Sequence, residues 1–175
     1  MKQMHFCSTY AHVRKKGYHM NIRRAKTEDM ERINELLLQI CLVHHKDRPD
    51  LFKYGAKKYT DEQLKEIIQN DRTPIFVAVD ENDLVLGYAF CIFKQAVNDN
   101  ILTDIKTLYI DDLCVDEVYR GRRIGRALYE AVVDYARKQG CYNVTLNVWG
   151  RNESALSFYE ACGLRVQKIG MEMIL

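Results

Sequence analysis

The sequence predicts a single α/β domain with a mixed, mostly antiparallel central sheet that is flanked by helices. Short runs of β-branched, aromatic and apolar residues alternate along the chain with longer stretches whose apolar residues recur at helical spacing. No repeat and no linker rich in Gly, Pro or Ser divides the 175 residues. A chain of this length can bury a core without disulfides or metal ions. The expected element order is β-α-α-β-β-β-α-β-α-β.

The first part of the domain is predicted to contain one short strand and two helices. A strand at 21–25 precedes a helix that begins at Thr27, a typical N-cap residue, and ends near His44. The second helix opens at Thr60, where Thr60-Asp61-Glu62-Gln63 has the form of a capping box, and continues to about residue 70.

The second part of the domain is predicted to contain most of the sheet. Apolar, β-branched runs give the strands, helical spacing gives the helices, and glycines follow the two helix ends. The expected strands are 75–79, 84–93, 108–115, 143–148, 164–168 and 171–175, and the expected helices are 124–139 and 153–161.

Composition excludes several classes of protein. The formal net charge is only +2, and basic residues gather only at 14–16 and 120–126, which argues against a nucleic-acid-binding protein. No apolar run approaches the length that spans a membrane. The six cysteines are scattered, without metal-site spacing, so we expect reduced thiols, no metal and a cytoplasmic protein.

The N-terminal segment differs from the rest of the chain. Residues 1–19 show no clear periodicity and lack the apolar stretch of a secretory signal. Met20 directly precedes the first predicted strand. We therefore expect residues 1–19 to be an extension, flexible or produced by an upstream start, and residues 20–175 to be the folded domain.

The most informative local pattern is the turn between the strand at 108–115 and the helix that follows it. Gly121 and Gly125 allow a close approach of the backbone, and the helix beginning at Ile124 offers unpaired N–H groups. The positive end of a helix and nearby arginines favour a phosphate or pyrophosphate group. A solvated basic turn would have the same local sequence.

A second motif, Asn-Glu-Ser-Ala-Leu-Ser-Phe-Tyr-Glu-Ala-Cys-Gly-Leu at 152–164, decides between these readings. Together with the element order it resembles the GNAT superfamily of N-acetyltransferases. In that family the earlier turn follows the pattern Gln/Arg-x-x-Gly-x-Gly/Ala. Here Arg120 and Gly125 match, but Arg123 stands where the middle glycine is usual. We expect this departure to be tolerated if the φ angle of Arg123 is negative.

The resemblance implies that the chain binds acetyl-CoA. It implies that the pantetheine arm pairs with the backbone of Leu113, Cys114 and Val115. It implies contacts of Asn152 and Ser154 with the cofactor, although Asn152 also suits the N-cap of the helix at 153–161. The residues implied to hold the pyrophosphate are Arg120, Gly121, Arg122, Arg123, Ile124, Gly125 and Arg126.

The reaction implied is direct attack of an amine on the thioester, which needs an acid and a base. Tyr159 matches the family tyrosine that protonates the departing thiolate. Asp111 and Asp112 are carboxylates within an otherwise apolar strand, and alternation is expected to send them to opposite faces. Asp111 is the preferred base, whereas Asp112 is expected to bind the acceptor ammonium or a loop N–H. Ordinary ion pairing is the alternative for both.

Other residues are candidates for the acceptor site. His44 titrates near neutral pH, although a histidine at a helix end also stabilises the helix dipole. Tyr109 is an aromatic residue that can line the site or fill the core. Asn147 occupies the position where some protein-modifying members carry a glutamate base, which disfavours acetylation of protein N-termini.

We therefore expect an acetyl-CoA-dependent N-acetyltransferase that acts on a small cationic amine. A protein acetyltransferase acting on lysine or an N-terminus, and a non-catalytic acyl-CoA-binding module, are the alternatives. The resemblance also allows a homodimer. The loops at 44–58 and 94–107 are expected to set the acceptor specificity.

Overall fold

The computed structural model describes residues 10–12 and 20–175. They form a six-stranded sheet in the order β1-β2-β3-β4-β5-β6, antiparallel throughout except for the parallel pair β5 and β6. This confirms the predicted mixed, mostly antiparallel sheet. The strands are β1 (Tyr10–His12), β2 (Asn21–Arg24), β3 (Ile75–Val79), β4 (Val85–Gln95), β5 (Lys106–Val115) and β6 (Asn143–Leu146).

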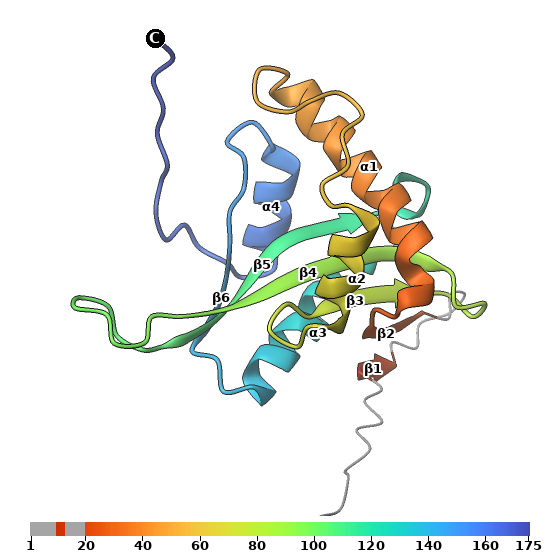
Figure 1. Ribbon diagram of the computed structural model, residues 1–175, viewed down its shortest axis with the longest axis horizontal. Helices are drawn as coiled ribbons and strands as arrows, with labels where there is room; N and C mark the ends of the chain where they lie inside the picture. The colour runs from red at the N-terminus through yellow and green to blue at the C-terminus, as the bar shows by residue number, and fades with distance from the viewer. Residues whose placement is uncertain (1–9, 13–19) are drawn as a thin grey trace, which may run out of the picture.

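Helices cover both faces of the sheet (Figure 1). The helices α1 and α2 lie on one face and α3 on the other, while α4 packs beside the N-terminal half of α3. The helices are α1 (Met30–Asp47), α2 (Asp61–Gln69), α3 (Ile124–Lys138) and α4 (Glu153–Ala161), with short 3-10 turns at Thr27–Asp29 and Glu117–Tyr119.

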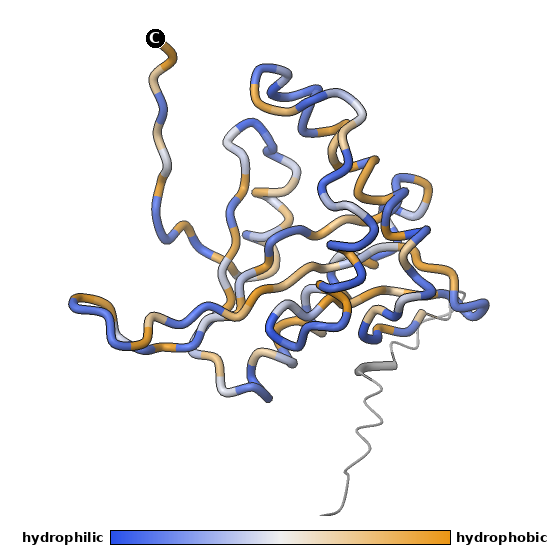
Figure 2. Tube along the Cα trace, in the orientation of Figure 1, coloured by the Kyte–Doolittle hydropathy of each residue, from blue (hydrophilic) through white to orange (hydrophobic). Residues whose placement is uncertain are grey.

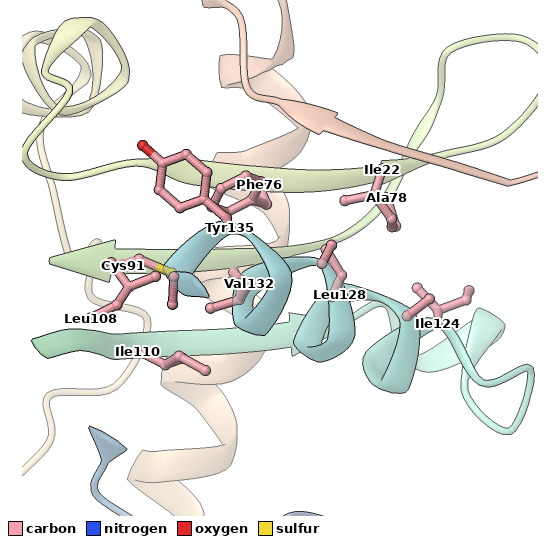
Figure 3. Packing of buried hydrophobic residues seen from close by; sticks show 14 of the residues in the cluster. Ile22, Phe76, Ala78, Cys91, Leu108, Ile110, Ile124, Leu128, Val132 and Tyr135 are labelled. Atoms are coloured by element: carbon pink, nitrogen blue, oxygen red, sulfur yellow. The ribbon is translucent and has the colours of Figure 1, made fainter. Parts of the chain in front are cut away.

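The core on the α3 face is built from one stripe of that helix. Ile124, Leu128 and Val132 are at most 2% exposed and pack against the inward side chains of β2 to β5 (Figure 3). Tyr135 continues the stripe and meets the ring of Phe76 edge-on, with centroids 5.0 Å apart. Spacings of three and four residues place these side chains on one face of the helix, as the sequence predicts.

The opposite face carries a second core under α1 and α2. Ile33, Leu36 and Leu37 of α1 and Leu64 of α2 are at most 1% exposed. Each buried aliphatic side chain contributes about 1.5–3 kcal/mol relative to an exposed one. These contacts hold α1 over β4 and β5, where the candidate site lies.

Several predicted elements are confirmed, and the start of α1 differs from the prediction. The strand Ile75–Val79 and the helix Glu153–Ala161 have the predicted bounds, and the Thr60–Gln63 capping box is formed. Thr27 is not the N-cap of α1, since it begins a 3-10 turn whose Asp29 carboxylate accepts from Lys26 N at 2.7 Å.

The predicted C-terminal strands at 164–168 and 171–175 are wrong for this structure. Residues 164–175 form no helix or strand, and their large apolar side chains other than Leu164 are exposed. The alternating pattern is present, but a strand forms only when a neighbouring strand satisfies its backbone groups. No described strand pairs with this segment.

The expected N-terminal extension falls largely outside the described residues. Within 1–19 only Tyr10–His12 is described, and it pairs antiparallel with β2 as strand β1.

Candidate active site

The site is organised by a gap between β5 and β6. Pairing between these parallel strands runs from Thr107 with Asn143 to Ile110 with Leu146, and β6 ends there. Beyond this point β5 continues to Val115, paired on its other side with β4 alone. Within the described part of the chain, one backbone edge of residues 111–115 therefore has no neighbouring strand, including the predicted pantetheine contacts Leu113, Cys114 and Val115.

A β-bulge lies where the gap begins. Phe90 pairs with Asp112 and Cys91 pairs with Ile110, so Asp111 is an extra residue in β5. A bulge interrupts the alternation of side chains. The carboxylates of Asp111 and Asp112 consequently lie on the same face, toward α1 and α2, which corrects the expectation of opposite faces.

Both carboxylates lie near one ammonium group. Lys58 Nζ is 2.9 Å from Asp111 Oδ2 and 4.0 Å from Asp112 Oδ2. The Tyr59 hydroxyl donates to Asp111 Oδ2 at 3.2 Å, and the Tyr88 hydroxyl donates to Asp112 Oδ2 at 2.9 Å. The cluster therefore contains two carboxylates and one cation.

Burial and neighbouring charges shift the pKa values of the groups in this cluster. The pKa of Asp112 is raised because burial disfavours its charged form, and the nearby Lys58 ammonium offsets part of this effect. The pKa of Lys58 is raised: burial lowers it, but the two aspartates more than compensate. Burial also raises the pKa of the Tyr88 phenol. A buried carboxylate with a raised pKa is a better proton acceptor than an exposed one.

The turn that follows β5 is anchored to α1. The buried Asp116 forms an ion pair with Arg32 of α1, and its Oδ1 accepts from Val118 N at 3.1 Å. Arg32 Nε also donates to Val85 O at 3.1 Å. These bonds hold the start of the predicted phosphate turn against the sheet.

The turn itself uses two left-handed residues. Gly121 has φ +77° and Arg123 has φ +64°, and Arg123 is the N-cap residue of α3. The negative φ under which the arginine at 123 was expected to be tolerated is therefore not present. No side chain caps the N-terminus of α3. The N–H groups at Ile124, Gly125 and Arg126 are therefore available to an anion.

The predicted arginines differ in their surroundings. Arg120 Nε donates to Val115 O at 3.1 Å, and the Arg122 guanidinium lies over the Tyr119 ring. Arg126 pairs with Glu130 at 2.9 Å and donates to Ala161 O at the end of α4. Arg126 thus links α3 to α4.

The residues predicted on α4 lie at its two ends. Asn152 is the N-cap, with Oδ1 accepting from Ala155 N at 3.0 Å, and Ser154 is exposed on the first turn. Tyr159 packs against Phe158 and Tyr129. Burial raises the pKa of Tyr159, and the charge of Asp112 raises it further, so the phenol keeps its proton at neutral pH.

The remaining predicted residues border the cluster. His44 lies in the last turns of α1 and stacks on Phe52 with ring centroids 5.0 Å apart. Burial lowers the pKa of His44, and the charges of Asp112 and Lys58 also act on it. The Tyr109 hydroxyl accepts from Asn147 Nδ2 at 3.2 Å, and the charge of Asp111 helps raise its pKa.

Sequence reasoning missed Lys58, Tyr59 and Tyr88. Lys58 and Tyr59 precede the capping box of α2, which gives them an ordinary local role. Their partner Asp111 is more than fifty residues away, so no local spacing signals the contact. The polar tip of Tyr88 is similarly hidden within an apolar strand.

Comparison with known proteins gives the family of this fold and site. The model of the acetyltransferase (GNAT) family matches residues 40–164, which include β5, the turn at 116–126 and α4. The chain belongs to the GNAT family. The resemblance predicted from the motifs at 120–125 and 152–164 is thereby confirmed.

Individual relatives agree with this assignment. An N-acetyltransferase of Bacillus subtilis, YhfO, is 32% identical over 145 residues, covering 82% of this chain and 89% of the relative. N-alpha-acetyltransferase 30 of Schizosaccharomyces pombe is 31% identical over 130 residues, covering 74% and 78%. The crystal structure of a BH1408 tetramutant from Bacillus halodurans has a TM-score of 0.84 at 32% identity, covering 88% and 99%.

Other GNAT relatives match over shorter spans. The chain spans 51% of an N-acetyltransferase of Methanocaldococcus jannaschii at 28% identity. It spans 42% of a glucosamine 6-phosphate N-acetyltransferase of Arabidopsis thaliana at 35% identity.

Among residues 10–12 and 20–175, none of the helices is long and apolar enough to cross a membrane. Within the same residues, no group of three or more His, Cys, Asp or Glu side chains is placed to hold a metal ion.

Proposed function

We propose that this GNAT-family chain transfers an acetyl group from acetyl-CoA to a small primary amine that binds as a cation. The observation that carries the proposal is the pair of carboxylates on one face of β5. They lie on the strand whose following residues, 113–115, have a free backbone edge and lead into the turn before the uncapped N-terminus of α3.

The described residues fit a cofactor of this shape. The free edge of Leu113 to Val115 can pair with the amide groups of a pantetheine arm, as an added strand would. The N–H groups between Arg120 and Arg126 can bind pyrophosphate oxygens. Asn152 and Ser154 lie at the start of α4, where we propose a further contact. Acetyl-CoA supplies the thioester whose carbonyl carbon the amine attacks.

The charge of the cluster favours a cationic acceptor. Lys58 lies near both carboxylates and contributes one positive charge against two negative ones, so the cluster as a whole favours an additional cation nearby. The lowered pKa of His44 keeps that imidazole neutral at neutral pH, so it does not repel a cation. We propose that His44 and Tyr109 border the acceptor rather than react with it.

The roles that we propose for the two aspartates differ from those expected from the sequence. Asp111 Oδ2 accepts from both Lys58 and Tyr59, which stabilises its charged form and makes it a poor base. Asp112 is more buried and has a raised pKa. We therefore propose Asp112 as the proton acceptor and Asp111 as the group that holds the ammonium.

Tyr159 is the proposed acid. Burial, and then the charge of Asp112, raises the pKa of its phenol, so the hydroxyl carries the proton that a departing thiolate needs. In the balanced step the bound ammonium first gives one proton to Asp112 and attacks as the free amine, so that the nitrogen–carbonyl bond forms and the carbon–sulfur bond breaks. Tyr159 gives its proton to the departing sulfur, and the second proton that leaves the nitrogen returns to the Tyr159 phenolate.

A thiol-release assay tests the proposal when acetyl-CoA binding is measured by calorimetry on the same preparation. The acceptors are a panel of aliphatic diamines, amino sugars, aminoglycosides and peptides. We expect the highest kcat/KM with a small cationic amine. Binding of acetyl-CoA without transfer to any acceptor would indicate an acyl-CoA-binding module, and absence of binding would reject the proposal.

A polypeptide acceptor is the second candidate. It is favoured by the 31% identity to N-alpha-acetyltransferase 30 over 74% of this chain. It is disfavoured by Asn147, whose amide cannot act as a base and instead bonds Tyr109. Transfer to peptide α-amines in preference to small amines would favour this candidate.

The described cysteines are consistent with a reducing location. Cys41, Cys91, Cys114, Cys141 and Cys162 are all free thiols, from which we propose a cytoplasmic protein. We also propose that neither nucleic acid nor a membrane is a partner, given the low net charge.

A further inference from the structure

Lys58 lies in the connection between α1 and α2, and its ammonium group is placed as that of an acetyl acceptor would be. Its Nζ is 2.9 Å from Oδ2 of Asp111, the carboxylate proposed to hold the acceptor ammonium. It is also 4.0 Å from Oδ2 of Asp112, the proposed proton acceptor. Hydrophilic residues interrupt the apolar residues of β5 at this part of the sheet (Figure 2). The lysine of the chain itself therefore meets the two groups that the proposed reaction assigns to an external amine.

The residues next to Lys58 hold it over the sheet. Tyr59 stacks on Phe90 of β4 with ring centroids 5.7 Å apart, and its hydroxyl donates to Asp111 Oδ2 at 3.2 Å. Lys58 Nζ lies 5.5 Å from the centroid of the Tyr59 ring, and Thr60 begins the capping box of α2. An amine held beside its reaction partners reacts faster than a free one, because the entropy of bringing them together has already been lost.

The proposed path of acetyl-CoA brings its thioester toward the same place. The pyrophosphate is assigned to the turn at 120–126, and the pantetheine arm to the free edge of β5 at 113–115. Because this turn follows the C-terminal end of β5, an arm that starts there runs back along the strand, from 115 toward 113. The thioester at the far end of the arm then lies toward residues 111 and 112, whose carboxylates lie beside the Lys58 ammonium.

We propose that Lys58 is acetylated by the acetyl-CoA bound to the same chain, which makes it a site of self-acetylation. The inference rests on the proposed function, since it uses the same donor, acid and base. The Lys58 ammonium gives one proton to Asp112, and its nitrogen bonds to the thioester carbonyl carbon as the carbon–sulfur bond breaks. Tyr159 gives its proton to the sulfur, and the second proton that leaves the nitrogen returns to the Tyr159 phenolate. The products are an uncharged amide on Lys58 and free CoA.

Lys57 provides a comparison within the same chain. Its side chain is 50% exposed and pairs with Asp61 at 2.7 Å, whereas the side chain of Lys58 is 33% exposed. Burial lowers the pKa of Lys58, but the charges of the two aspartates raise it overall, which keeps its amine protonated. Collision with an acetyl donor in solution therefore favours Lys57. Preferential acetylation of Lys58 indicates transfer from a bound donor.

Peptide mapping by mass spectrometry tests the proposal on the full chain, incubated with isotopically labelled acetyl-CoA and no other amine. We expect a labelled acetyl group on Lys58, formed at least about tenfold faster than on Lys57, together with release of CoA. Acetyl phosphate lacks the CoA moiety and, as the control donor, is expected to modify Lys57 in preference. An unmodified Lys58 in a preparation that acetylates small amines overturns self-acetylation alone. A preparation that acetylates neither overturns the proposed function as well.

A matched pair of variants shows whether this acetylation uses the candidate active site. Tyr159→Phe removes the proposed acid and should slow the acetylation of Lys58 by about tenfold or more, with that of Lys57 unchanged. Tyr129→Phe removes the hydroxyl of the neighbouring ring and should leave both rates unchanged. Where Lys58 is already acetylated after expression, the same comparison is made on the purified chains. Equal acetylation of Lys58 in the unsubstituted chain and in Tyr159→Phe overturns the proposal.

Mixing two kinds of chain separates transfer within one chain from transfer between chains. The Tyr159→Phe variant, labelled with a heavy nitrogen isotope, is incubated with the unlabelled, unsubstituted chain and acetyl-CoA. We expect fast acetylation of Lys58 on the unlabelled chain only, at a rate per chain that does not depend on protein concentration. Equal modification of the labelled chain overturns transfer from a donor bound to the same chain.

Discussion

Asp111 and Asp112 are consecutive in β5, yet their carboxylates lie on the same face and share the ammonium of Lys58. The distances from Lys58 Nζ are 2.9 Å and 4.0 Å. The β-bulge at Asp111 produces this arrangement, because it adds one residue to β5 opposite Phe90 and Cys91. A regular strand would place one of the two carboxylates in the α3 core.

The first prediction separates the roles of these aspartates. Asp112→Asn removes the proposed proton acceptor, so kcat should fall by about 10²- to 10⁴-fold and the acid limb of the pH–rate profile should flatten. Asp111→Asn should mainly raise KM for the amine, with the acid limb retained. Steady-state kinetics across pH measure both effects, and the reverse pattern would return the base role to Asp111.

The second prediction concerns Lys58. Its positive charge lowers the pKa of Asp112, so its removal should raise that pKa. A base must be deprotonated to act, and the acid limb of kcat/KM should therefore move to higher pH in Lys58→Met. Lys58→Arg keeps the charge and should leave the limb near its original position. An unshifted profile in Lys58→Met would mean that another group sets the limb.

The third prediction concerns Tyr159. Tyr159→Phe removes a hydroxyl that no described side chain is hydrogen-bonded to, so the free energy of unfolding should change little. Turnover should fall by about tenfold or more, since the thiolate loses its proton donor, while the Kd for acetyl-CoA stays nearly unchanged. Tyr129→Phe removes a hydroxyl from the neighbouring ring of α3 and serves as the control. Unchanged turnover in Tyr159→Phe would remove the acid role.

The sequence predicted those parts of the candidate site that lie within a single turn or helix. The Gly and Arg pattern of 120–126 and the motif at 152–164 each lie within one turn or helix, and their placement followed from helix caps and periodicity. The position of Asp111 did not follow, because a bulge depends on how β5 pairs with β4. Lys58 reaches the site across the fold, from the connection between α1 and α2.

Two of the corrected expectations depend on structure beyond the local sequence. The predicted strands at 164–168 and 171–175 have suitable sequences, but a strand forms only where a neighbouring strand pairs with it. The arginine at 123 was expected to be tolerated at negative φ, because non-glycine residues rarely adopt positive values. In the structure Arg123 has φ +64°.

The last prediction follows from that conformation. A non-glycine residue in the left-handed region costs about 1–2 kcal/mol, while glycine loses about 0.5–1 kcal/mol through greater freedom of the unfolded chain. Arg123→Gly should therefore raise the free energy of unfolding by up to about 1 kcal/mol. Arg123→Ala removes the same side chain but keeps the unfavourable φ, so it should show no such gain.

Denaturant unfolding of the two variants measures the difference, and calorimetry with CoA reports the turn itself. Because the backbone N–H groups are unchanged in both variants, loss of CoA affinity should be equal in Arg123→Gly and Arg123→Ala and should reflect the lost charge alone. Equal free energies of unfolding for the two variants would show that the positive φ of Arg123 does not destabilise the fold. A larger loss of affinity in Arg123→Gly would show that the arginine is needed to hold the turn in its binding conformation.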